Sequence, residues 1–251
     1  RGRKIEEQVL AANVDVAFLV AALDGERGFN LRRLERYLTL ARNGGVQPVV
    51  VLNKADLSDR LEAAQAEAKG IAAGARVYVV SAETGTGIDS LAAYVAPGRT
   101  LVLLGPSGVG KSSIINRLLG ESILPVNEVR EGDARGKHTT SWSALRVLPG
   151  GGVLIDTPGM REVLLGSDEQ SVDATFAEIL ALAGGCKFGD CRHGDEPGCA
   201  VRAALESGEL DAARFDSYLK LRDEVKRTRE QLDQGAAKRG GTRAVRVRRE
   251  K

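Results

Sequence analysis

The stretch Gly105-Pro106-Ser107-Gly108-Val109-Gly110-Lys111-Ser112 has the spacing G-x-x-x-x-G-K-S and follows the apolar run from Thr100 to Leu104. Its glycines let the backbone fold into a nest of N–H groups around phosphate oxygens, and a helix expected over residues 111–119 directs its N-terminus at them. In such a P-loop Lys111 reaches the β and γ phosphates, while Ser112, followed by Ser113, offers a hydroxyl to Mg²⁺. A chance glycine-rich turn would not need a strand before it and a helix after it. The sequence therefore predicts a nucleoside triphosphate site.

A second motif, Asn53-Lys54-Ala55-Asp56, follows the apolar run from Pro48 to Leu52. An aspartate placed as in N-K-x-D accepts from both N1–H and the 2-amino group of guanine. Adenine offers neither donor, and a site that hydrogen-bonds a group the competitor lacks discriminates by ~10⁴ or more. We expect Asn53 to brace the loop and the Lys54 stem to lie along the base plane. The pair of motifs predicts GTP and GDP as ligands, although a P-loop ATPase with an accidental N-K-A-D is a rival interpretation.

Ser81-Ala82 follows the next predicted strand, residues 76–80. In GTPases a Ser-Ala pair at this place provides a backbone contact to the guanine O6, whereas elsewhere it is merely a helix-entry turn. Its position after Asn53 favours the guanine contact. Earlier in the chain, residues 14–22 predict a buried parallel strand, and Asn30 is expected to cap a helix through about Arg42.

The γ-phosphate motifs come last. Residues 125–140 are polar, charged and without a clear period, which is typical of a mobile switch loop, and the loop closes at Thr139-Thr140. Either threonine could supply a second hydroxyl to Mg²⁺, and we favour Thr140. Asp156-Thr157-Pro158-Gly159 then places a carboxylate near the Mg²⁺ water shell and the Gly159 N–H near the γ phosphate.

The sequence lacks the glutamine that many GTPases use to orient the attacking water. Met160 stands where many regulatory GTPases carry a glutamine that orients the attacking water, so we expect slow turnover that a partner stimulates. His138, in the switch loop, could orient water, and it could equally be a surface histidine.

The five motifs occur in a permuted order. Ordinary GTPases run from P-loop to switch threonine, D-x-x-G, N-K-x-D and Ser-Ala, but here the two base-reading motifs precede the three phosphate-reading ones. Circular permutation keeps each strand's place in space while moving the termini. We therefore predict an α/β fold: a circularly permuted P-loop GTPase domain, with a mostly parallel sheet flanked by helices, followed by a small helical zinc-binding domain.

Every cysteine and one of the two histidines lie in the spacing C-x₄-C-x-H-x₅-C, as Cys186, Cys191, His193 and Cys199. Three thiolates and an imidazole suit tetrahedral Zn²⁺, and four protein ligands leave no open position, so the site should be structural. The odd cysteine count and an expected cytoplasmic setting argue against a disulfide. A redox sensor is a further alternative.

The length and composition of the chain limit the class of protein that it can be. With 251 residues, 43% of them hydrophobic, the chain can bury a substantial core, and it contains no apolar run long enough for a membrane span, so we expect a cytoplasmic protein with no membrane partner. Residues 235–251 hold seven Lys or Arg against one Glu, so the net charge of +2 conceals a basic end. We expect residues 1–8 to be a linker, 9–166 the GTPase domain, 167–233 the zinc domain with a helix over 211–232, and 234–251 a basic disordered tail. An RNA-contacting arm is a compatible reading of that tail.

Together the motifs resemble one family, the circularly permuted, ribosome small subunit-dependent GTPase A group. The resemblance covers nearly the whole chain. It rests on residues 11–15 (Ala-Ala-Asn-Val-Asp), 53–56, 105–113, 136–140, 156–159 and 186–199. It implies a GTP hydrolase that acts in late maturation of the bacterial 30S subunit, is slow alone, is stimulated by the small subunit and binds 16S rRNA through its flanking domains. We expect a monomer.

Family members also carry an N-terminal oligonucleotide-binding barrel, which these residues do not contain. The chain opens at Arg1 and its single methionine is Met160, so we expect a piece of a longer protein. A rival from another functional class is a zinc-dependent RNA-binding adaptor that uses GTP as a switch with little turnover.

Overall fold

The computed structural model describes residues 11–25, 28–120, 144–156 and 168–247, without the side chains of 144, 156 and 235–247. The chain divides into two compact units, one ending at Val163 and one beginning at Leu164. Each is described separately below. The predicted boundary at residue 166 falls between described segments and stays a prediction.

The first unit is built on one mixed sheet in the order β3-β2-β1-β4-β6-β5. All neighbours are parallel except β5 and β6, which form an antiparallel pair at one edge. The strands are β1 (Val16–Ala22), β2 (Gln47–Asn53), β3 (Arg76–Val79), β4 (Thr100–Leu104), β5 (Ala144–Val147) and β6 (Val153–Asp156). The predicted α/β sheet is confirmed.

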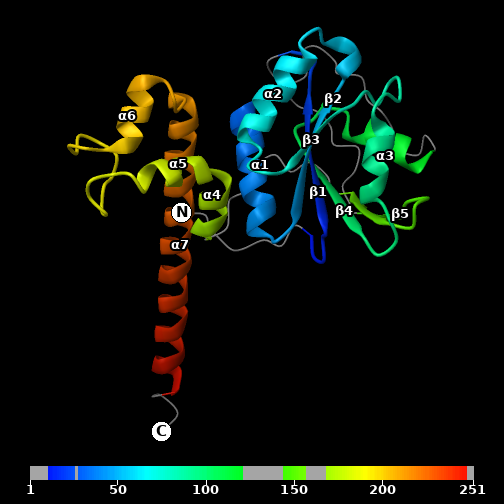
Figure 1. Ribbon diagram of the computed structural model, residues 1–251. Helices are drawn as coiled ribbons and strands as arrows, with labels where there is room; N and C mark the ends of the chain where they lie inside the picture. The colour runs from blue at the N-terminus through cyan, green and yellow to red at the C-terminus, as the bar shows by residue number, and fades with distance from the viewer. Residues whose placement is uncertain (1–10, 26–27, 121–143, 157–167, 248–251) are drawn as a thin grey trace, which may run out of the picture. The chain divides into compact units, whose positions relative to one another are not determined.

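Helices cover both faces of this sheet (Figure 1). On one face lie α1 (Leu31–Asn43) and α2 (Leu61–Ile71), and on the other lie α3 (Lys111–Leu119) and the 3₁₀ helix η2 (Ile88–Tyr94); a further 3₁₀ turn, η1, spans Ala55–Leu57. β1 is buried along its whole length because it supplies alternate side chains to both apolar layers, with Phe18 in one and Leu19 in the other.

Local signals fix the two helices that matter most for the site. The Asn30 side chain accepts from the Arg33 N–H at 2.9 Å and caps α1, as predicted. α3 starts at Lys111 directly after Gly110, whose φ of 89° is readily available only to glycine, and it ends at Leu119, where Gly120 caps it with a φ of 72°. The predicted bounds of α3 are confirmed.

The second unit is helical. Its helices are α4 (Glu169–Thr175), α5 (Ala177–Ala183), α6 (Ala200–Ser207) and α7 (Ala212–Val247). Arg214, in the first turn of α7, lies over the Phe176 ring at 4.1 Å and donates to the Thr175 carbonyl and the Glu178 carboxylate, each at 2.7 Å. This side chain fastens α7 to the junction of α4 and α5.

The expectation of a disordered tail from residue 234 is wrong for most of its length. α7 starts one residue after the predicted position 211 but runs on to Val247 instead of ending at 232. The basic stretch contains no proline, and its Ala, Lys and Arg residues favour helix strongly enough to carry the backbone through Gly235, Gly240 and Gly241. A composition that looked disordered therefore continues a helix that the packed unit has already nucleated.

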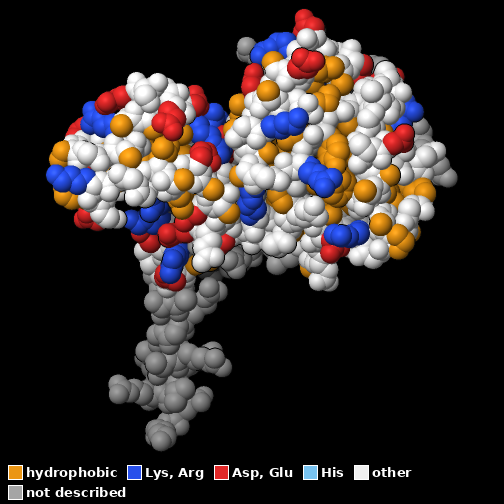
Figure 2. Space-filling model, viewed as in Figure 1, with side chains coloured by type: hydrophobic (Ala, Val, Ile, Leu, Met, Phe, Trp, Pro, Cys, Tyr) orange, Lys and Arg blue, Asp and Glu red, His pale blue; other side chains and the backbone are white. Residues whose placement is uncertain are grey.

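In the described part of the chain, no helix has the length and apolar character needed to cross a bilayer. On the face shown in Figure 2, Lys and Arg side chains lie among Asp and Glu side chains on both units, so the surface charge there is mixed.

Candidate nucleotide site and metal centre

The nucleotide motifs meet at the carboxyl ends of neighbouring strands. The P-loop follows β4, Asn53 ends β2, and Ser81 and Ala82 come just after β3. The helix after β1 covers one face of the sheet and the helix after β4 covers the other, so the topology switches between these two adjacent strands. Ligands of open α/β sheets bind at such a switch point.

The P-loop backbone packs so closely that side chains would not fit at two of its glycines. A Cβ on Gly105 would lie 2.5 Å from the Val20 carbonyl oxygen, and one on Gly110 would lie 2.2 Å from Asn53 Nδ2. Lys111 folds back over the loop and donates to the carbonyls of Gly105 and Pro106 at 2.8 and 2.7 Å. Ser112 lies in the first turn of α3. A cradle of this shape, with an ammonium group at its mouth, fits a phosphate chain.

Asn53 joins the base-reading and phosphate-reading loops. Its buried side chain donates from Nδ2 to the Val109 carbonyl at 2.9 Å and accepts at Oδ1 from the Ala82 N–H at 3.0 Å. One amide therefore holds the P-loop and the Ser-Ala loop together, across 56 and 29 residues of sequence respectively. The expected bracing role is visible in the geometry. The backbone contact to guanine O6 expected from the Ser-Ala pair stays a prediction.

Asp56 is set beside the same loop. Its Oδ1 accepts a hydrogen bond from the buried Ser81 hydroxyl, which also accepts from the Thr84 N–H at 3.1 Å. Ser81 thereby orients the carboxylate that is expected to read the guanine N1–H and amino group. The sequence suggested only a backbone role for this Ser-Ala pair.

Two residues outside every motif also contact these loops. Asp24, just beyond β1, pairs with the Lys54 ammonium, and Arg117 on α3 donates to the carbonyls of Ala82, at 2.7 Å, and Glu83. No spacing pattern marks either residue. The register of β1 against β2, with Ala22 opposite Asn53, would have indicated Asp24.

The γ-phosphate residues are only partly visible. His138, Thr139, Thr140, Gly159 and Met160 lie outside the described residues, and Asp156 is described only as the last backbone position of β6. β6 runs beside β4, so its carboxyl end points toward the same edge as the P-loop. The roles expected of these residues stay predictions.

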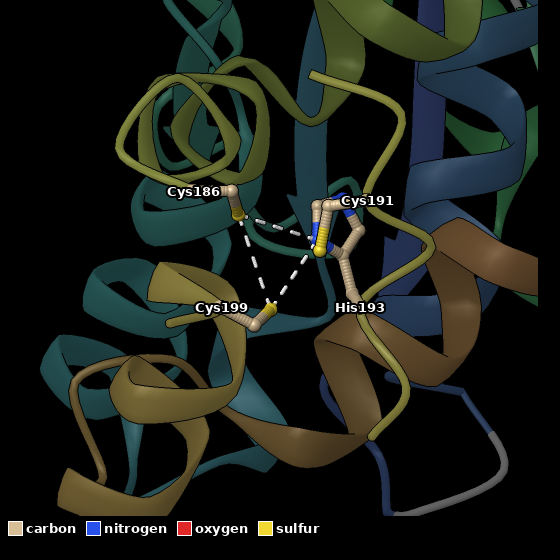
Figure 3. A group of neighbouring side chains, drawn as sticks. All are labelled: Cys186, Cys191, His193 and Cys199. Carbon is tan, nitrogen blue, oxygen red and sulfur yellow. Dashed lines mark hydrogen bonds between the residues drawn. The ribbon is translucent and has the colours of Figure 1, made fainter. Parts of the chain in front are cut away.

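The second unit brings four potential metal ligands together (Figure 3). The ligand atoms of Cys186, Cys191, His193 and Cys199 all lie within 4.8 Å of one another. Cys186 Sγ lies 3.9 Å from Cys199 Sγ, and His193 Nδ1 lies 3.6 and 3.5 Å from those two sulfurs. A tetrahedral ion with Zn–S of about 2.3 Å and Zn–N of about 2.0–2.1 Å requires separations of about 3.8 and 3.6 Å. The separations among Cys186, His193 and Cys199 are therefore compatible with a tetrahedral zinc ion that His193 would bind through Nδ1.

Backbone geometry and surrounding side chains hold this cluster in place. His193 has a φ of 62°, and the Glu196 carboxylate clamps its turn by accepting from the N–H groups of Arg192, at 3.0 Å, and Gly194, at 2.7 Å. Arg202 closes the same turn by donating to the Gly194 carbonyl and to Asp195. These contacts preorganise the ligands in the manner of outer-shell partners.

The electrostatics of the cluster also favour a bound cation. Burial lowers the pKa of His193, which keeps the imidazole neutral and able to ligate. Desolvation opposes ionisation of Cys186, but the backbone N–H groups of Val201 and Ala200, at the start of α6, outweigh it and lower the pKa of that thiol. The His193 N–H lowers the pKa of Cys191, yet desolvation and the two neighbouring thiols raise it to about 11. A metal ion would relieve this mutual repulsion of the thiolates.

Comparison with known proteins places this geometry in a family. A family model described as RsgA GTPase matches residues 1–166. A small ribosomal subunit biogenesis GTPase of Opitutus terrae is 53% identical over 219 residues, which are 87% of this chain and 59% of that protein. The chain spans about three fifths of the length of the curated relatives it matches.

Two solved structures agree with the permuted topology. YjeQ from Thermotoga maritima superposes with a TM-score of 0.61 at 32% identity, over 85% of this chain and 72% of that one. YloQ, described as a circularly permuted GTPase, gives 0.58 at 30% identity, over 85% and 69%. The predicted permutation is thus confirmed, together with the predicted fold class.

Proposed function

The chain belongs to the RsgA GTPase family, and from that premise we propose that the protein hydrolyses GTP during late maturation of the small (30S) ribosomal subunit. Turnover is slow alone and is stimulated by the subunit. The name shared by its relatives, small ribosomal subunit biogenesis GTPase, supports the process. The observation that carries the chemistry is the double hydrogen bond of Asn53, which fixes a guanine-reading loop against a phosphate-binding loop.

Each motif residue then has a role. The P-loop N–H groups and Lys111 bind the β and γ phosphates, Asp56 reads the guanine edge, and Ser112 holds the Mg²⁺ that accompanies GTP. Among the residues outside the described segments, Thr140 supplies a second hydroxyl and Gly159 an N–H toward the γ phosphate, while His138 orients water. Asp156 lies near the metal's water shell.

The second unit serves the ribosome contact in this proposal. One Zn²⁺ held by Cys186, Cys191, His193 and Cys199 gives it a fixed shape, and the unit contacts 16S rRNA. The protein acts in the cytoplasm as a monomer with no membrane partner. Zinc here is structural because all four tetrahedral positions are filled by the chain.

The test is GTP hydrolysis by the full-length protein alone, with 30S subunits and with 70S ribosomes. We expect Lys111→Ala to abolish turnover and Asp56→Asn to lower GTP-over-ATP selectivity, which a correctly read guanine supports at ~10⁴. Lys69→Ala, an exposed lysine on α2, is the matched control and should behave as wild type. Wild-type turnover by Lys111→Ala, or unchanged selectivity of Asp56→Asn, would contradict the assignment.

One feature favours a second function, a zinc-dependent RNA-binding adaptor that uses GTP as a switch. Met160 follows Gly159 directly and cannot orient a water as glutamine does. Phosphate release measured with and without 30S subunits separates the two. A rate that the subunits leave unchanged, beside tight GTP binding, would favour the adaptor.

A further inference from the structure

The lysine of N-K-A-D is held by a residue that belongs to no nucleotide motif. Lys54 Nζ pairs with the carboxylate of Asp24, and the two side chains are 21% and 30% exposed. Lys54 itself has a φ of 63°, so its backbone already lies in the left-handed region that ordinary residues seldom adopt. Both ends of this residue are thus constrained, one by the turn and one by the ion pair.

The fold places Asp24 there by strand register. Ala22 lies opposite Asn53 at the carboxyl ends of β1 and β2, and the next residue, Leu23, donates its N–H to the Asn53 carbonyl at 2.8 Å. The chain leaving β1 therefore runs beside the base-reading loop for one residue longer than the sheet itself. Asp24 comes next, directly within reach of Lys54.

A tight turn then fixes the orientation of Asp24. Gly28 donates to the Gly25 carbonyl at 3.1 Å, and a Cβ at Gly28 would lie 2.5 Å from both Asp24 Oδ1 and the Ala22 carbonyl oxygen. The backbone therefore packs against the Asp24 carboxylate in a way that only glycine permits. This close approach holds Oδ2 toward the lysine.

An untethered lysine on a loop samples many rotamers, and ordering its stem on a ligand costs free energy. Asp24 ties down the ammonium end, so the four-carbon stem is held in place before nucleotide arrives, and its apolar methylenes are available to pack on a flat base. We propose that Asp24 is a positioning residue for guanine-nucleotide binding, acting through Lys54. This inference rests on the proposed function, since it assumes that Asn53, Lys54 and Asp56 surround the base.

The experiment is a double-mutant cycle of Asp24→Asn and Lys54→Met. The dissociation constant of N-methylanthraniloyl-GDP is measured by fluorescence, and kcat with 30S subunits is measured at saturating GTP. We expect Asp24→Asn to weaken binding about fivefold, which is ~1 kcal/mol and fits a partly exposed ion pair. We also expect kcat to stay within about twofold, because the pair acts before the chemical step. In the Lys54→Met background, Asp24→Asn should change nothing further.

Two controls keep the result interpretable. Asp89→Asn, an exposed carboxylate on η2, should bind as wild type, and thermal unfolding midpoints should agree among all variants. Should Asp24→Asn fail to fold, Asp24→Ser repeats the test. The inference would be overturned if a folded Asp24 variant bound the probe as wild type. It would also be overturned if Asp24→Asn weakened binding equally in the wild-type and Lys54→Met backgrounds. Either result would leave the proposed function intact. Failure of the wild type to bind the GDP probe would overturn the proposed function instead.

Discussion

The two units hold their sites by different means. In the sheet unit, apolar layers on both faces of six strands fix the strand ends, and the nucleotide loops need only a few hydrogen bonds to meet. The helical unit buries a smaller set of apolar side chains around Phe176 and places its four donors largely on loops. We therefore expect burial alone to fold the first unit, and we expect folding of the second unit to depend on a metal ion bound by its cysteines and histidine.

The largest expected effect is that of metal removal, which should unfold one unit and leave the other folded. Stripping the ion with a chelator, or replacing Cys191 by Ala, should unfold the helical unit, because structural zinc contributes about 10–16 kcal/mol in small domains. The sheet unit should keep its amide protection and its GDP affinity. Hydrogen exchange read separately for the two units makes the measurement.

Ser207→Ala, at the exposed end of α6, is the control for the cysteine replacement. Retained protection of the buried Phe176 and Ile179 amides in the metal-free protein would contradict this difference between the units, because it would mean that the small apolar core suffices.

The next effect compares two phenylalanines of equal burial. Phe18 in β1 and Phe176 at the junction of α4 and α5 are both fully buried, so replacing either by Ala should cost about 3–5 kcal/mol. We expect each replacement to lower the stability of only the unit that contains it. Urea unfolding followed by GDP binding for the sheet unit, and by zinc release for the helical unit, should show one shifted midpoint per variant. Both midpoints shifting together would mean that the units unfold as one.

The smallest effect concerns pH. Burial, more than the hydrogen bond that it shares with Tyr78, raises the pKa of Tyr94 from 10.0 to about 12. Because the folded-state pKa is the higher one, the protonated phenol stabilises the sheet unit below pH 10, and that contribution is lost as the pH rises toward about 12.

Tyr94→Phe tests this linkage. The variant loses the 3.2 Å contact with Tyr78 and should be destabilised by roughly 1 kcal/mol near neutral pH. By about pH 11 the gap should narrow, because the unfolded wild type then releases the Tyr94 proton that the folded protein still holds, and the variant has no such proton. Urea unfolding at both pH values measures this difference in the free energy of unfolding. A difference that does not change with pH would mean that ionisation of Tyr94 does not contribute to the loss of stability at high pH.

Sequence reasoning worked where a pattern has one physical cause. Continuous apolar runs marked β1 and β2, the glycine spacing fixed the bounds of α3, and the spacing of three cysteines and a histidine indicated a cluster that the fold does assemble. It failed where the cause is tertiary. Asp24 and Arg117 reach the nucleotide loops through strand register and helix packing, and neither is visible in local spacing.

In the basic C-terminal stretch, local composition predicted too little structure. Its basic, glycine-containing composition predicted disorder, but propagation from a packed helix costs far less than nucleation, so α7 continues through it. The switch residues around Thr140 and Gly159 lie outside the described segments, and their roles rest on motif chemistry.

The strand order has a further consequence for how the protein is made. Of the described strands β1 is made first, β2 adds to one side of it and β3 adds to β2; β4 then adds to the free side of β1. Each of these newly synthesised strands thus meets a neighbour that is already present, and only the β5–β6 hairpin brings its own partner. Moving the termini has left a sheet that can grow outward from β1 during translation, although one side of β1 stays unpaired until β4 is made, with Leu101 opposite Val16.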